Sequence, residues 1–148
     1  MLIPTKILVP TDFSEYSSTA LAQAFDIAKE YNAKVYVLHV IHETLRRTLD
    51  GYILNAEDIK KIERDMVKNA KKNLQDQVNK FPLSKEVEVF TEIANGNPSD
   101  EILKAQKEKG IDLIVISSLG RSGLARYLIG SVARNVLKSA ECPVLLTK

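Results

Sequence analysis

Short apolar segments with the character of β-strands alternate along this chain with segments of helical periodicity. The strand-like segments lie at residues 6–10, 34–40, 86–93, 112–117 and 143–147, and the helical ones at 14–31, 59–78, 97–110 and 131–139. A helix that connects two strands of one sheet almost always places those strands parallel to each other. The alternation therefore predicts an α/β fold, with a five-stranded parallel sheet between layers of helices.

Two of the predicted strands differ in the burial that their sequences indicate. Residues 112–117, Asp-Leu-Ile-Val-Ile-Ser, are almost continuously apolar, which is typical of a central parallel strand covered on both faces. Residues 86–93 instead alternate, with apolar residues and Thr91 on one face and glutamates on the other. We therefore expect 112–117 at the centre of the sheet and 86–93 near its edge.

Length and composition limit the class of protein. A chain of 148 residues suits one domain, and we expect residues 1–148 to fold together. The net charge of +2 provides no broad positive field for nucleic acid or an anionic membrane. We find neither a leader segment nor a membrane-spanning run, and we expect a cytoplasmic protein. The only cysteine, Cys142, has no disulfide partner and is interpreted as a packing residue.

Ligands of open parallel sheets bind beyond the carboxyl ends of the strands, which directs attention to residues 10–12 and 117–131. The second segment contains three glycines, Gly120, Gly123 and Gly130. Glycines let backbone amides approach a phosphate, and the helix predicted from Ser131 would offer unpaired N–H groups to an anion. Arg121 would add a charge-assisted contact. The alternative is that these glycines only shape turns, since the segment matches neither the Walker motif nor the dinucleotide fingerprint.

Other polar residues are open to structural interpretations. Asp12 precedes a helix start, so its carboxylate either caps that helix or contributes to a site, and it can do the latter if Ser14 is the cap. His39 lies within an apolar strand and is interpreted as a hydrogen-bonded core histidine. His42 is expected in an irregular segment at the surface, without metal ligands beside it. A lysine cluster on the second helix is expected to form a solvated face, and its members are Lys68, Lys71 and Lys72.

Four stretches of the sequence resemble universal stress proteins. They are 7–15 (ILVPTDFSE), 38–41 (LHVI), 96–98 (GNP), and the glycine segment from Gly120-Arg121-Ser122-Gly123 through Gly130-Ser131 to Cys142-Pro143-Val144-Leu145. This resemblance covers nearly the whole chain. It implies a doubly wound, Rossmann-like domain of the adenine nucleotide alpha hydrolase-like type, with strand order 3-2-1-4-5.

In the nucleotide-binding branch of that family the pattern is G-x2-G-x9-G-[S/T]. Gly120, Gly130 and Ser131 match it, whereas Ser117 replaces the first glycine and Leu119 stands where a histidine is common. We expect Ser117 to keep β backbone geometry, with its hydroxyl available to a ligand oxygen. The resemblance implies that the nucleotide contacts Pro10, Thr11, Asp12, Val40, Ser117, Ser118, Leu119, Gly120, Arg121, Ser122, Gly123, Gly130, Ser131, Val132 and Ala133.

The roles implied by the resemblance divide these residues among the parts of the ligand. Pro10 and Asp12 would approach the ribose, Val40 the adenine, residues 117–123 the ribose and phosphates, and the amides of residues 131–133 the phosphates. Any magnesium would be bridged by the phosphates rather than held directly by the protein.

The resemblance implies an ATP-binding regulatory module of the stress response. Two alternatives stay open, namely a slow ATP hydrolase and a nucleotide-free dimeric interaction protein. No catalytic residue is assigned, because local spacing provides no general base. The last strand, 144–147, is short and apolar, and a terminal strand of that kind predicts a homodimer through pairing of its edge.

Overall fold

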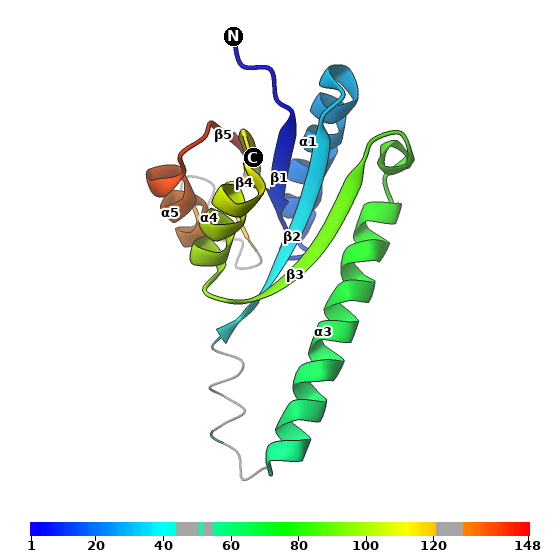
Figure 1. The fold of residues 1–148 in the computed structure, drawn as a ribbon, viewed down its shortest axis with the longest axis vertical. Coiled ribbons are helices and arrows are strands. Elements are labelled where there is room, and N and C mark those ends of the chain that lie inside the picture. The colour runs from blue at the N-terminus through cyan, green and yellow to red at the C-terminus, as the bar shows by residue number, and fades with distance from the viewer. Residues whose placement is uncertain (44–50, 52–54, 121–128) are drawn as a thin grey trace.

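The computed structural model describes residues 1–43, 51, 55–120 and 129–148, and its centre is a five-stranded sheet (Figure 1). The strands are β1 (Lys6–Pro10), β2 (Lys34–His42), β3 (Val89–Gly96), β4 (Leu113–Ser117) and β5 (Val144–Thr147). All neighbouring strands are parallel and their order is β3-β2-β1-β4-β5. The parallel sheet that the sequence pattern predicted and the strand order that the resemblance implied are thus confirmed.

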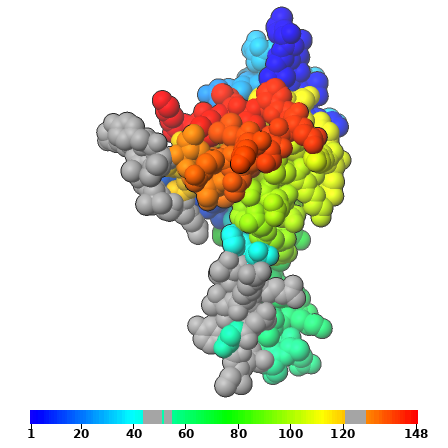
Figure 2. Space-filling model, turned by 90° about the vertical axis from the view of Figure 1, so that its left-hand side faces the viewer, coloured from blue at the N-terminus to red at the C-terminus, as the bar shows by residue number. Residues whose placement is uncertain are grey.

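Helices cover both faces of this sheet. They are α1 (Glu15–Tyr31), α3 (Ala56–Asn79), α4 (Pro98–Lys109) and α5 (Ser131–Ser139), with a short 3-10 helix, η1, at Pro82–Lys85. The helices α1 and α3 pack on one face, while α4 and α5 lie side by side on the other (Figures 1 and 2). None of the helices within the described ranges is both long enough and apolar enough to cross a membrane.

The central strands are buried because their side chains alternate between two cores. In β1, Ile7 and Val9 pack under α1 and α3, whereas Leu8 faces α4 and α5, and all three are fully buried. Burial of an aliphatic side chain of this size contributes about 1.5–3 kcal/mol relative to exposure. The strand β4 alternates in the same way, which agrees with the continuous apolar run predicted to be central.

Helix boundaries follow the capping signals of the sequence. Ser14 caps α1 by accepting a hydrogen bond from the Ser17 amide at 3.2 Å, and Asn97 caps α4 by accepting one from the Asp100 amide at 3.2 Å. Both helices end at a residue in the left-handed region, Asn32 with φ 55° and Gly110 with φ 66°.

The bounds predicted for the third and second strands were wrong, and α3 begins at Ala56 rather than at Ile59. The third strand begins at Val89 rather than Glu86, because η1 precedes it and the Glu86 amide donates to the Leu83 carbonyl of that turn. Pairing with β2 then carries β3 on to Gly96, at the sheet edge as expected. The second strand continues to His42, so this histidine ends β2 instead of lying in an irregular segment.

Candidate functional site

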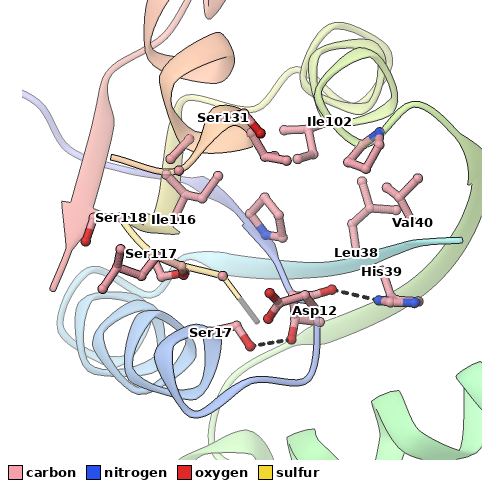
Figure 3. A pocket seen from close by; sticks show the side chains of 18 residues that line it. Asp12, Ser17, Leu38, His39, Val40, Ile102, Ile116, Ser117, Ser118 and Ser131 are labelled. Atoms are coloured by element: carbon pink, nitrogen blue, oxygen red, sulfur yellow. Dashed lines mark hydrogen bonds between the residues drawn. The ribbon is translucent and has the colours of Figure 1, made fainter. Parts of the chain in front are cut away.

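A cavity of about 280 Å³ lies at the carboxyl ends of β1 and β4, where the chain order of the sheet reverses (Figure 3). Its lining includes twelve residues predicted from the sequence: Pro10, Thr11, Asp12, Val40, Ser117, Ser118, Leu119, Gly120, Gly130, Ser131, Val132 and Ala133. The remaining three predicted residues, Arg121, Ser122 and Gly123, lie outside the described part of the chain. The fold therefore gathers at one place residues that are more than a hundred positions apart in sequence.

One side of the cavity is apolar. Leu38 and Val40 of β2 contribute to it together with Ile116 of β4, and α4 adds Pro98 and Ile102 at its amino end. Figure 3 shows Leu38, Val40, Ile102 and Ile116 along this wall. Small-molecule sites are commonly lined by apolar side chains of this kind, against which a flat ring can pack.

Six lining residues were missed by the sequence analysis: Ser17, Leu38, His39, Pro98, Ile102 and Ile116. The sequence pattern points to the loops after β1 and β4, whereas the amino end of α4 reaches the same edge of the sheet. The sequence Asn97-Pro98 marks that helix start and was the available signal.

The amino end of α5 forms the polar side of the cavity and differs from the other helix starts. Side chains cap α1, α3 and α4, and each carries acidic residues in its first turn. In α5 the N-cap is Gly130, which has no side chain to cap the helix, and the first turn holds no acid. The amides of residues 131–133 precede the first intrahelical hydrogen bond, which Arg134 donates to Gly130 at 2.9 Å. Such a helix start favours an anion by about 0.3–1 kcal/mol through its dipole alone.

Gly130 also holds the loop after β4 against α5. Its amide donates to the Ser118 carbonyl at 2.7 Å, and a β-carbon at Gly130 would lie only 3.3 Å from that oxygen. A side chain at position 130 would therefore press on backbone beside the first amides of α5.

Asp12 stands between the helix α1 and the cavity. Its Oδ1 accepts a hydrogen bond from the Ser14 amide at 3.0 Å, while Ser14 itself caps α1. Ser14 is thus the cap, as the sequence required for Asp12 to have a role in a site, but the carboxylate of Asp12 is itself engaged in this turn through Oδ1. A β-carbon at Gly120 would lie 2.9 Å from Oδ2 of Asp12, so the loop after β4 passes directly against this carboxylate.

Ser117 keeps β geometry, as expected, since it is the last residue of β4 and is paired with Thr147. Its hydroxyl, however, does not extend toward a ligand as the sequence analysis anticipated. It donates a 2.6 Å hydrogen bond to the carbonyl of Leu119, two residues further on. The side chain therefore closes the first turn of the loop that leads to Gly120.

His39 is a hydrogen-bonded, half-buried histidine, in agreement with its structural interpretation. Its Nδ1 lies 2.8 Å from the Thr11 carbonyl, and because a carbonyl only accepts, Nδ1 carries the proton. The ring stacks on Phe13 with centroids 4.2 Å apart. The sequence did not predict that His39 also lines the cavity.

Fold and cavity together define a doubly wound α/β protein with a cavity at the topological switch point of its sheet. The sequence model of the universal stress protein family matches residues 4–148, and the chain belongs to that family.

Relatives and solved structures agree with this assignment. Universal stress protein YxiE of Bacillus subtilis is 39% identical over 146 residues, which are 97% of this chain and 98% of YxiE. The structure of protein MJ0577 of Methanocaldococcus jannaschii superposes with a TM-score of 0.85 at 30% identity, covering 99% of this chain and 97% of that one. A universal stress protein of Archaeoglobus fulgidus solved in complex with dAMP gives a TM-score of 0.66 at 25% identity, covering 99% and 100%.

Proposed function

We propose that this chain binds ATP in the cavity at the ends of β1 and β4 and acts as a regulatory module. The observation that carries the proposal is the amino end of α5, where the N-cap is a glycine and the first turn holds no acid, and which opens on a cavity with an apolar opposite wall. In this arrangement the adenine packs near Val40 and Ile102, and the phosphates meet the amides of residues 131–133.

The ribose position follows from the positions proposed for the adenine and for the phosphates. Between the apolar wall and α5 lies Asp12, whose carboxylate accepts hydrogen bonds and is suited to sugar hydroxyls. The dAMP complex of the Archaeoglobus relative supports an adenine nucleotide as the ligand class. In this proposal any magnesium enters with the nucleotide, bridged by its phosphates.

We prefer a regulatory role to hydrolysis because the sequence assigns no general base to this site. His39 lines the cavity, and its Nδ1 proton is donated to the Thr11 carbonyl. We place the protein in the cytoplasm in this proposal, since ATP is available there.

We also propose a homodimer through β5. This strand ends the sheet and pairs only with β4 within the described chain. Leu145 is 37% exposed there, and an unprotected strand edge invites pairing with a second copy. The residues of β5 and α5 lie together on the face drawn in orange to red in Figure 2.

The test is gentle purification followed by native mass spectrometry for a co-purifying small molecule. We expect a mass increase that matches ATP, and calorimetric titration of the emptied protein with ATP gives the affinity. Phosphate release over hours then separates binding from slow hydrolysis. A protein that retains no nucleotide and binds none at millimolar concentration would instead support the nucleotide-free interaction protein.

A further inference from the structure

The helix α3 reaches the cavity through one buried amide. Gln77, on the last turn of α3, is 5% exposed and is not part of the cavity lining. It packs against Thr11 and Ser17, two buried polar residues that do line the cavity. Burying an amide is costly unless its polar atoms are hydrogen-bonded, so the contacts of Gln77 show what the residue does.

The amide of Gln77 bridges the end of β1 and the start of α1. Its Oε1 accepts a 2.7 Å hydrogen bond from the Thr11 hydroxyl, and its Nε2 donates to the Ser18 hydroxyl at 3.0 Å. Thr11 Oγ1 also lies 2.9 Å from Oγ of Ser17, which itself donates to the Ser14 carbonyl. Three chain segments therefore meet in one buried polar group.

Thr11 is held at each of its polar groups. Its amide donates to the Leu38 carbonyl at 2.9 Å, its carbonyl accepts from His39, and its hydroxyl donates to Gln77. The hydrogen bonds of Ser17 and His39 are drawn as dashed lines in Figure 3. Of these contacts, only the one to Gln77 comes from α3.

The turn after Thr11 needs such support. Phe13 has φ 66°, a left-handed conformation that is strained for a bulky residue and persists only where the surroundings impose it. The Phe13 amide donates to Thr11 Oγ1 at 3.1 Å, and its ring stacks on His39. The hydroxyl that Gln77 orients is thus the acceptor that fixes the backbone on both sides of Asp12.

We propose that Gln77 is a positioning residue for nucleotide binding: by holding the Thr11 hydroxyl, it fixes the turn that presents the Asp12 carboxylate to the ribose. The inference rests on the proposed function, and it adds a residue outside the cavity on which affinity depends.

The test compares Gln77→Met, which keeps most of the side-chain volume and removes the amide, with Val78→Ala. Val78 is the next residue of α3, is 3% exposed, and packs in the apolar core away from the polar group. We expect Gln77→Met to weaken ATP binding by about tenfold, as for the loss of one well-placed hydrogen bond. Val78→Ala should lower the free energy of unfolding without changing the ATP affinity of the folded protein.

A second ligand separates positioning from general damage. Because the effect acts through Asp12 and the ribose, 2′,3′-dideoxy-ATP should bind Gln77→Met and the wild type with equal affinity. Equal losses for both ligands, or a Gln77→Met affinity for ATP that matches Val78→Ala, would overturn the inference while the proposed function stands. A wild type that binds no ATP would overturn the proposed function and, with it, this inference.

Discussion

Gly120 and Asp12 are in contact across the mouth of the cavity, with the place of a β-carbon on Gly120 only 2.9 Å from Asp12 Oδ2. The contact joins the loop after β4 to the loop after β1, which are the two segments that the parallel sheet brings to its switch point. The glycine is needed here for close approach.

Gly120→Ala tests this contact. The added methyl group forces the Asp12 carboxylate to turn away, and we expect ATP affinity to fall about tenfold. The free energy of unfolding should change by less than about 1 kcal/mol, because the atom in the way ends a flexible side chain. Calorimetric titration and urea unfolding measure the two effects.

The control removes the carboxylate first. In an Asp12→Ala background the methyl group at position 120 meets no oxygen, so Gly120→Ala should cost no further affinity. An equal loss in both backgrounds would show that Gly120 acts through the loop backbone instead.

Gly130→Asp is expected to abolish ATP binding and leave the protein folded. The carboxylate would place negative charge at the amino end of α5, and its β-carbon would press on the Ser118 carbonyl 3.3 Å away. Titration with ATP and circular dichroism measure the two outcomes. Gly130→Ala is the matched control, because it adds the β-carbon without the charge. An unchanged ATP affinity in Gly130→Asp would contradict the proposed position of the phosphates.

Leu145→Lys tests the proposed homodimer. A lysine in the middle of β5 places a charge on the exposed edge strand, which natural proteins use to prevent edge pairing. Light scattering at micromolar concentration should show a dimer for the wild type and a monomer for the variant. A wild type that is already monomeric would exclude pairing through β5.

Cys142 should react slowly as a thiol. Burial raises its pKa above the usual range, and the negative charge of Asp112 raises it further, so the thiolate is scarce near neutral pH. We expect the pH profile of its reaction with a disulfide reagent to lie at higher pH in the folded protein than in urea. Overlapping profiles would contradict this.

The raised pKa of Cys142 also determines how the free energy of unfolding changes with pH. The folded state holds the proton of the Cys142 thiol more tightly than the unfolded state does. The resulting contribution to the free energy of unfolding is present below the thiol pKa of the unfolded state and is lost as pH rises through the thiol pKa of the folded state. Cys142→Ser should remove that part of the alkaline loss of stability.

The sequence predicted the fold well because its signals were local. Pro10 as the last residue of β1, the Asn97 cap and the left-handed Gly110 each mark a boundary through the chemistry of one or two residues. The predicted start of the third strand was three residues too early. Residues 86–88 continue the alternating pattern of a strand, but they form the turn between η1 and β3. Periodicity could not detect that pairing with β2 begins only at Val89.

Part of the cavity lining was predicted from the sequence, and the lining residues that were missed depend on tertiary packing. Residues next to the strand ends were found, since the switch-point rule concerns strand order. His39 and Ile102 were missed because their place in the wall depends on how β2 and α4 pack, and Gln77 was missed because its partner Thr11 is sixty-six positions away. The spacing of residues along the sequence does not predict contacts between residues so far apart.

Ser117→Gly addresses the position where this chain departs from the family pattern. Serine fits there, since Ser117 is paired in β4 and its hydroxyl donates to the Leu119 carbonyl at 2.6 Å. Glycine would remove that hydrogen bond and loosen the turn toward Gly120, while it opens space beside the ribose. The two effects oppose each other, so ATP affinity should change by less than about tenfold, or ~1.4 kcal/mol.

Ser117→Ala separates the two effects, because it removes the hydroxyl and keeps the β-carbon. We expect calorimetric titration to give Ser117→Ala the weaker ATP binding of the two variants, since it loses the hydrogen bond to Leu119 and gains no space. A wild type that binds no ATP at millimolar concentration, with binding restored by Ser117→Gly and not by Ser117→Ala, would mean that the β-carbon of Ser117 blocks the ligand. The natural protein would then be a nucleotide-free member of its family, and Ser117 would be the residue that makes it so.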